Sequence, residues 1–195
     1  MEADWEVEVG GGAPVIDALW PGLVDLRVAP ERVSELPEIA AMPALADTLV
    51  ALNAPASPVW TAKCDVWPVD AFDPDELDAP HEDGLEAIGC YIDLLPKSGG
   101  QWRQPEEAAG WCKGVCGRMR ALRVRSCRVD LVVRGARLAP GRMEYGVTAY
   151  LTAAGAGPGA ASDALGAALA ALADTVCAAA SAVAPDQSYN ENVGE

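Results

Sequence analysis

Four stretches of the sequence alternate apolar and polar residues, which is typical of β-strands with one buried face. These stretches are VWTAKCDVW (59–67), IGCYIDLL (88–95), SCRVDLVVR (126–134) and YGVTAYLT (145–152). Three further stretches have apolar residues at helical spacing, at 42–53, 105–122 and 162–183. This pattern predicts an α+β fold: a two-layer sandwich with helices mainly on one face of a mostly antiparallel sheet of four or slightly more strands.

The order helix-strand-strand occurs twice, over residues 42–96 and 105–154, before the closing helix at 162–183. A few residues match between the halves, namely Lys63 with Arg128, Asp65 with Asp130, and Tyr91 with Tyr150. The matches are compatible with a duplicated αββ unit and equally with two ordinary hairpins. An alternative counts VDLRV (24–28) as a first strand, which gives the ferredoxin-like order with an added strand and helix.

The sequence also suggests a division of the chain. Residues 1–35 contain two short alternating pieces between Gly and Pro, so we expect an N-terminal arm or edge strands there. Residues 36–184 form a single α+β domain, and the polar residues 185–195 form a disordered tail.

Charge is divided unevenly along a chain whose formal net charge is −15. Residues 1–95 hold 3 basic and 20 acidic residues, whereas residues 97–142 hold 11 basic and 3 acidic ones. The excess of negative charge argues against nucleic-acid binding, because a phosphate backbone repels such a molecule. The two segments either neutralise each other in the fold or leave a basic face for an anion.

The first residues are acidic and lack the features of a secretory signal, which predicts a cytoplasmic protein with reduced thiols. The most apolar run, 164–184, consists mainly of Ala and contains Asp174. We therefore expect a soluble helix rather than a membrane span, and no membrane partner.

The stretch GWCKGVCGRMR places Cys112 and Cys116 four residues apart within the helix expected at 105–122. Thioredoxin-like chemistry needs two residues between the cysteines, and the sequence has no second Cys or His pair at metal-ligand spacing. We expect both cysteines to pack in the core, and we predict neither a metal site nor a cofactor.

Alternation assigns one face of each strand to the core, including Trp60, Ala62, Cys64 and Val66 of the first strand. The opposite face then carries polar and aromatic side chains. The candidate partner or ligand residues on it are Lys63, Asp65, Trp67, Tyr91, Asp93, Arg128, Asp130 and Tyr150. Residues i and i+2 of a strand lie roughly 7 Å apart on one side, so Lys63 neighbours Asp65 and Arg128 neighbours Asp130.

Two functions fit this face, because the sequence lacks a recognisable catalytic set. The first is a non-enzymatic acidic module that binds a protein partner through the acidic loop 70–86 and exposed tryptophans. The alternative is a small-ligand-binding protein or enzyme, in which Lys63 and Arg128 hold an anion and an aspartate acts as base or metal ligand. A homodimer formed through the open face or an edge strand is a further expectation. A pocket on the polar face would favour the alternative, and a flat surface would favour the protein-binding module.

Overall fold

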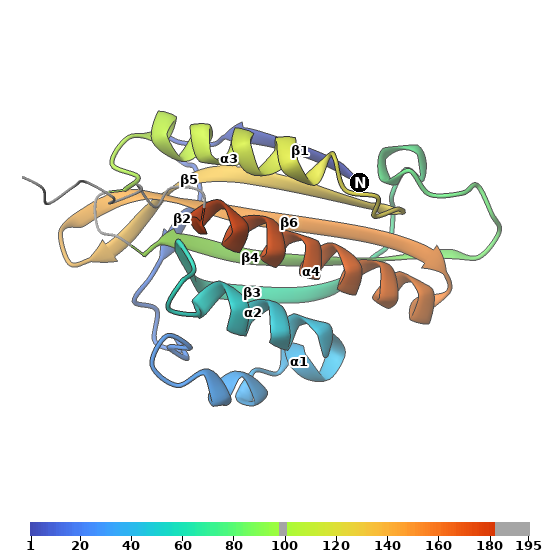
Figure 1. The fold of residues 1–195 in the computed structure, drawn as a ribbon, viewed down its shortest axis with the longest axis horizontal. Coiled ribbons are helices and arrows are strands. Elements are labelled where there is room, and N and C mark those ends of the chain that lie inside the picture. Colours follow the sequence, from blue (N-terminus) through green and yellow to red (C-terminus); the bar gives the residue numbers. More distant parts are fainter. Residues whose placement is uncertain (98–100, 182–195) are drawn as a thin grey trace, which may run out of the picture.

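The computed structural model describes residues 1–97 and 101–181, without the side chains of 179–181. The tail expected at 185–195 lies outside the described residues. The described chain forms one mostly antiparallel six-stranded sheet with helices packed on it, which confirms the predicted α+β sandwich (Figure 1).

Four long strands lie in the order β5-β6-β4-β3 and pair antiparallel, with β1 added parallel to β5 at one edge. The short strand β2 follows β1 along the same strand β5. The strand bounds are β1 Glu2–Val7, β2 Val15–Asp17, β3 Val59–Val69, β4 Leu85–Pro96, β5 Cys127–Ala139 and β6 Arg142–Ala156. The hairpin strands therefore occur where the alternation predicts them, and β2 is an addition that the alternation does not reveal.

The three longer helices, α2, α3 and α4, lie on one face of the sheet (Figure 1). The helix bounds are α1 Glu38–Ala41, α2 Ala44–Asn53, α3 Pro105–Met119 and α4 Pro158–Ser181, with 3-10 helices at Pro30–Glu35 (η1) and Asp75–Leu77 (η2). Helix α4 begins four residues before Ser162, the N-cap expected from the sequence. Gly157, at φ +86°, precedes it, and Pro158 has the fixed φ that suits a first helical residue.

Both cysteines of the CKGVC stretch lie in the core between α3 and the sheet. Cys112 and Cys116 are 0% exposed, and the Cys116 Sγ donates a hydrogen bond to the Asp4 carbonyl at 3.2 Å. Burial raises the pKa of the Cys112 thiol and raises that of Cys116 to about 11. Both thiols are therefore neutral packing groups at physiological pH.

Helix α4 is long and apolar enough to cross a membrane by length and composition alone. Half of its most apolar window is buried inside the protein. Leu165, Leu169, Leu172 and Val176 are fully buried in the main core, where α4 packs against β6 and β4. These contacts are those of a core helix in a layered fold.

A β-bulge in β3 overturns the expectation that Trp60 and Ala62 face the helices. The pairing of β3 with β4 shifts between Thr61 and Cys64, so alternation breaks at this point. Trp60 and Ala62 instead pack with Leu95 on the opposite face, in a second small core. Beyond the bulge, Cys64 and Val66 contact the main core as expected.

Residues 15–27, which we call the crossing segment, pass over the sheet face that the helices leave open. The segment starts in β2 beside β5 and reaches β3 at the other edge, where the Trp20 Nε1 donates to the Ala62 carbonyl at 2.9 Å. Ile16 and Ala18 of the segment close the second core. In Figure 1 the segment is the blue trace that runs from β2 down the left-hand end of the sheet.

Residues 24–28, VDLRV, form no strand, so the ferredoxin-like alternative loses its first strand. The Asp25 carboxylate accepts hydrogen bonds from the Arg27 backbone and guanidinium, which holds a local turn. Leu26 points into the main core from this turn. The apolar residues of this stretch thus anchor the crossing segment instead of pairing in the sheet.

Three ion pairs join the acidic first part of the chain to the basic segment 97–142. They connect Asp4 with Arg120, Glu8 with Arg134, and Asp17 with Arg137. All three fix the N-terminal residues to β5 or to Arg120, the C-cap residue of α3. The two oppositely charged segments therefore neutralise each other in part within the fold.

Candidate functional site

The candidate site lies on the outer face, by which we mean the sheet face opposite α2, α3 and α4. A row of paired residues crosses this face, in the order Asp65, Tyr91, Tyr150 and Asp130. The rings of Tyr91 and Tyr150 lie 6.1 Å apart at the centre of the row. Residues that align between the two halves of the sequence therefore lie on either side of the centre of the sheet. The duplication itself stays a prediction.

Trp67 extends the aromatic row towards the edge of the sheet. Its ring lies 6.1 Å from that of Tyr91 and covers Gly89, where an added Cβ would come within 2.7 Å of the indole. The glycine therefore makes room for the tryptophan to lie along the sheet.

A polar cavity of about 200 Å³ opens beside this row, between the sheet and the crossing segment. Its walls come from β3, β4, β5 and β6 on one side and from the crossing segment on the other. The lining residues are Lys63, Tyr91, Asp93, Arg134, Thr148 and Tyr150 of the sheet, with Val15, Asp17 and Trp20 of the crossing segment.

Asp93 lies on the floor of the cavity and is only 9% exposed. Its Oδ1 accepts a hydrogen bond from the Thr148 hydroxyl at 2.6 Å, whereas the structure describes no partner for Oδ2. Burial raises the pKa of the Asp93 carboxyl, against the effects of Thr148, Arg134 and Lys63, which favour the charged form. Burial also raises the pKa of the neighbouring Tyr91 to about 12, with the Asp93 charge contributing.

The two cations of the cavity are held differently. The Arg134 guanidinium donates to Glu8 at 2.8 Å and to the Tyr150 hydroxyl at 3.0 Å. The Lys63 ammonium lies 5.3 Å from the centre of the Trp20 ring, and the structure describes no hydrogen-bond or ion-pair partner for it. Lys63 is therefore the cation with donors available to a ligand.

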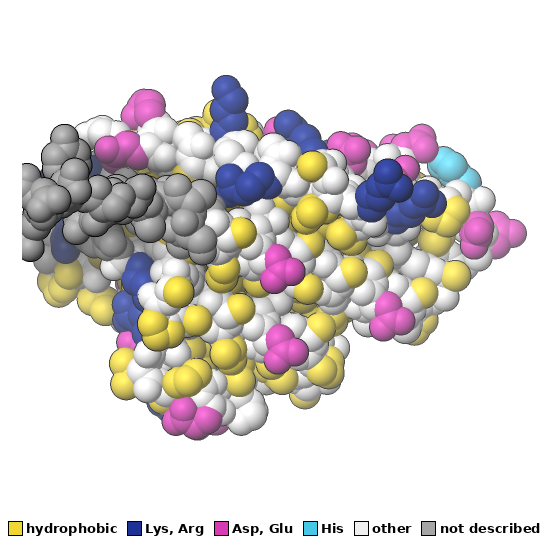
Figure 2. All heavy atoms as spheres, viewed as in Figure 1, with side chains coloured by type: hydrophobic (Ala, Val, Ile, Leu, Met, Phe, Trp, Pro, Cys, Tyr) yellow, Lys and Arg dark blue, Asp and Glu magenta, His cyan; other side chains and the backbone are white. Residues whose placement is uncertain are grey.

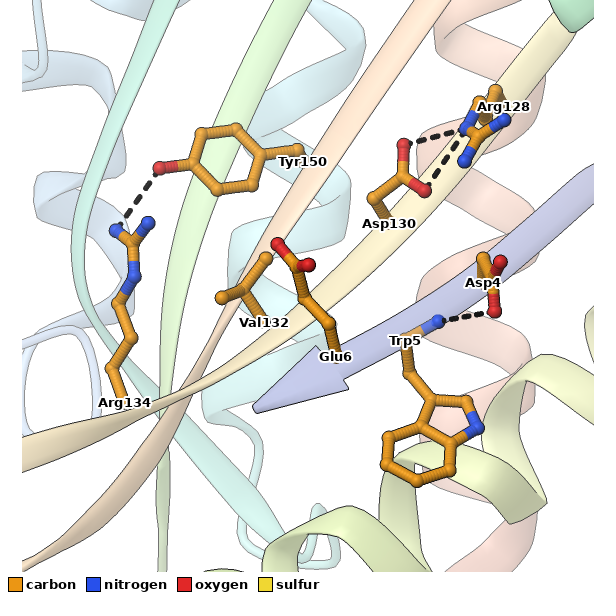
Figure 3. Close-up of a pocket in the computed structure, with 8 residues that line it drawn as sticks. All are labelled: Asp4, Trp5, Glu6, Arg128, Asp130, Val132, Arg134 and Tyr150. Carbon is orange, nitrogen blue, oxygen red and sulfur yellow. Dashed lines mark hydrogen bonds and ion pairs between the residues drawn. The ribbon is translucent and has the colours of Figure 1, made fainter. Parts of the chain in front are cut away.

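A second pocket, of about 400 Å³, adjoins the cavity over β1 and β5 and shares Arg134 and Tyr150 with it (Figure 3). Arg128 and Asp130 line this pocket and form an ion pair at 2.8 Å. Figure 3 shows Glu6 directed into the pocket while the Trp5 ring turns away. Asp4 and Glu6 add negative charge to this pocket, and Arg128 is already paired with Asp130. The pocket is therefore a poor site for an anion.

A third pocket, of about 380 Å³, adjoins the cavity on the β3 side and shares Trp20, Lys63 and Tyr91 with it. Its other walls are largely apolar. The apolar side chains include Val24, Leu26, Leu36, Pro37 and Leu49, and the carboxylates of Glu35, Glu38 and Asp65 also line the pocket. A polar and an apolar pocket therefore meet at Lys63 and Trp20.

The structure brings four of the predicted site residues into the central cavity: Lys63, Tyr91, Asp93 and Tyr150. Asp65 lines the apolar pocket, Arg128 and Asp130 line the pocket over β1, and Trp67 lies further along the aromatic row. The expected proximity of Arg128 to Asp130 appears as an ion pair. Lys63 instead faces Trp20, and Asp65 accepts a hydrogen bond from the Val66 amide.

Sequence reasoning did not select Trp20, Asp17, Arg134 and Thr148 as site residues. The alternation places Arg134 and Thr148 on the outer face. The sequence therefore contains enough information to predict these two as site residues. Trp20 and Asp17 join the site because the crossing segment folds over the sheet, and no local pattern reveals that path.

The described part of the chain offers neither a cluster of metal-ligating side chains nor a fully exposed tryptophan. Within residues 1–97 and 101–181, no group of three or more His, Cys, Asp or Glu side chains is placed to hold a metal ion. None of the six tryptophans is fully exposed, and Trp60 and Trp102 are buried. Their number therefore reflects packing within the chain, which weakens the inference of a tryptophan-rich protein interface.

The acidic loop lies away from the outer-face cavity, at one end of the sheet. Leu77 and Ala79 anchor it against Ala87 and Ala154, and His81 contacts Asp75 at 2.8 Å on the exposed side. Figure 2 shows the histidine among acidic side chains at the right-hand end of the molecule.

The chain matches no protein-family model, no curated protein and no solved structure.

Proposed function

We propose that this protein binds a small polar molecule in the cavity between the outer sheet face and the crossing segment. The observation that carries the proposal is the convergence of Lys63, Asp93 and Arg134, from three different strands, in a walled cavity. A concave site with a few converging polar groups and a carboxyl of perturbed pKa is the usual form of a ligand site.

The size of the cavity limits the class of ligand. Pockets that bury drug-sized ligands are usually about 300–1,000 Å³, and the central cavity measures about 200 Å³. A ligand of metabolite size fits this space, with one end reaching into the adjoining pocket of about 380 Å³.

The proposal is tested by thermal unfolding of the protein with a library of amino acids, organic acids, sugars and nucleotides. A ligand at about 100 times its Kd stabilises the folded state by about 2.7 kcal/mol, which raises the Tm of a chain this long by about 5 to 10 °C. We expect at least one compound to do so.

Three variants locate the site. Lys63→Met and Tyr91→Ala remove side chains of the cavity, and we expect them to abolish the shift in Tm. Lys113→Met changes an exposed lysine of α3, on the helix side of the sheet, and keeps the shift. The proposal is wrong if no compound stabilises the protein, or if every stabilising compound acts equally on all three variants.

A second candidate function is binding of a protein partner through the acidic loop. The supporting observation is that the loop is anchored by buried Leu77 and Ala79 while Asp73, Asp75 and Glu76 are exposed. A defined array of negative charge suits a basic partner surface. Replacing exposed acidic residues of 70–86 with Lys would abolish capture of such a partner, and capture that persists unchanged would exclude this role.

A further inference from the structure

The junction of the polar cavity with the apolar pocket indicates the chemistry of the ligand. Trp20, Lys63 and Tyr91 line both spaces. On one side of them lie Asp93 and Arg134, and on the other side lie mainly aliphatic side chains, with the carboxylates of Glu35, Glu38 and Asp65 at the same pocket. Leu26 and Leu49 are among the aliphatic side chains and are buried at the apolar end. A ligand that occupies both spaces has a polar head and an apolar tail.

The polar end offers one positive and one negative contact. Lys63 has three N–H donors and no described partner, and the Asp93 Oδ2 is also without one, since Thr148 bonds Oδ1. Arg134 and Asp17, the other charged residues of the cavity, are already paired with Glu8 and Arg137. Within the polar cavity, Lys63 and Asp93 are thus the two charged groups that remain for a ligand.

A ligand of a single charge satisfies only one of these groups. An anion on Lys63 would lie near the Asp93 carboxylate and be repelled by it, and a cation on Asp93 would lie near Lys63 and Arg134. A zwitterion pairs with both groups and leaves the net charge of the cavity unchanged.

We propose, building on the ligand-binding function above, that the ligand is an α-amino acid or a close analogue with an apolar or aromatic side chain. Its carboxylate lies on Lys63 and its ammonium on the Asp93 Oδ2. Its side chain packs in the apolar pocket against Trp20 and Leu26, where burial of apolar area favours binding.

The raised pKa of Asp93 supports this assignment. Burial destabilises the Asp93 carboxylate by more than Thr148, Arg134 and Lys63 stabilise it, and a bound ammonium adds an opposite charge in direct contact with it. Ligand binding therefore lowers the pKa of Asp93 towards its ordinary value and releases a proton at pH values near the raised pKa.

Three probes that share a ring and differ only in charge test the class of ligand. They are L-phenylalanine, 3-phenylpropionate, which lacks the ammonium, and 2-phenylethylamine, which lacks the carboxylate. Calorimetric titration of the full chain at neutral pH is expected to give L-phenylalanine an affinity at least tenfold above either analogue. Glycine, which lacks the apolar tail, is also expected to bind at least tenfold more weakly than L-phenylalanine.

Two variants assign the contacts. Lys63→Met is expected to reduce the affinity for L-phenylalanine at least tenfold and to leave that for 2-phenylethylamine within about twofold. Asp93→Asn is expected to reduce the affinity for L-phenylalanine and to leave 3-phenylpropionate as tightly bound or tighter. The control Lys113→Met keeps all three affinities.

The zwitterion assignment is overturned if 3-phenylpropionate or 2-phenylethylamine binds as tightly as L-phenylalanine. The small-ligand function survives that result, since a ligand still occupies the cavity. The assignment also fails if none of the three probes binds, and the library experiment above then decides the ligand-binding function separately.

Discussion

Asp93 combines deep burial with an ionisable group, so its protonation state links the site to the stability of the fold. Its pKa is raised from 3.8 by burial. The protonated carboxyl therefore favours the folded state, and this contribution is fully present below pH 3.8. It is lost as the pH rises through the raised pKa of the folded protein.

The Asp93→Asn variant tests this linkage. The neutral amide keeps an oxygen for the Thr148 hydroxyl and has no charge to bury, so we expect it to unfold at higher denaturant than the parent at pH 7. The difference should shrink as the pH falls towards 3.8, because the parent carboxyl is then protonated as well. Chemical unfolding at several pH values measures this, and a difference that is constant with pH would contradict the linkage.

Gly89 is a second residue whose role is local, because the Trp67 ring occupies the place of its side chain. We expect Gly89→Ala to displace the indole from the aromatic row and to destabilise the protein by about 1 to 3 kcal/mol. The matched control is Gly117→Ala on α3, where nothing lies within 4 Å of the added Cβ. Because alanine favours a helix over glycine, that change should stabilise by roughly 0.4 to 1 kcal/mol.

Urea unfolding and tryptophan fluorescence distinguish the two glycine variants. Equal stability changes, with no change in the emission of the Gly89→Ala protein, would show that Trp67 does not rest on Gly89.

Strand β3 is an edge strand of the sheet. Side chains form hydrogen bonds with several of its backbone groups. Asn53 accepts from the Thr61 amide at 3.1 Å, Asp65 accepts from the Val66 amide at 2.8 Å, and Trp20 donates to the Ala62 carbonyl. Pro68 adds a position without an N–H. These contacts hinder pairing with another chain at this edge, which makes β3 a poor surface for the expected homodimer.

Asn53 is the buried member of this set. Its side chain also donates to the Leu49 carbonyl at 2.8 Å and to the Thr61 hydroxyl at 2.7 Å. We expect Asn53→Ala to cost about 1 to 3 kcal/mol, because it leaves the Thr61 amide without its acceptor. A control, Ser34→Ala on the exposed side of η1, is expected to change stability by less than about 0.5 kcal/mol. Equal unfolding midpoints for both variants would contradict this role of Asn53.

The longer elements could be predicted from sequence because each has a regular period. The four hairpin strands and α2 to α4 are ten or more residues long, so a shift of a few residues at an end, such as the four at the start of α4, does not obscure them. The bulge at Thr61–Cys64 interrupts the alternation within a strand, and the inward assignment of Trp60 and Ala62 was wrong for that reason. Strand β2 has only three residues, too few for a period to be recognised.

The candidate site was predictable only where it depends on those strands. Lys63, Tyr91, Asp93 and Tyr150 share a face that the alternation defines, and the structure brings them together. The wall formed by Trp20 depends on contacts about forty residues apart in sequence. Such tertiary contacts have no local signature, so a surface predicted to be open is in fact partly enclosed.

The N-terminal residues make contacts on both faces of the sheet. Strand β1 extends the sheet at β5, Ala3 is buried in the main core beneath α3, and the Arg120 side chain donates to the Ala3 carbonyl at 2.6 Å. The chain then crosses the outer face to reach β3. Both the core and the cavity therefore depend on residues 1–27.

Deleting residues 1–8 tests this dependence. We expect a loss of stability of several kcal/mol and larger assemblies on size-exclusion chromatography, because the free edge of β5 and the apolar face beneath α3 become exposed. The milder variant Glu8→Gln, which removes one ion pair with Arg134, should lower stability by about 1 kcal/mol or less. An unchanged unfolding midpoint after the deletion would contradict a structural role for β1.

Native mass spectrometry of the freshly purified protein, with Lys63→Met and Lys113→Met in parallel, addresses the proposed ligand site most directly. After incubation with a metabolite extract, we predict a small-molecule adduct on the parent protein and on the matched control Lys113→Met, but not on Lys63→Met. A bare mass for all three proteins, or an adduct that survives in Lys63→Met, would contradict a ligand site in the cavity between the crossing segment and the sheet.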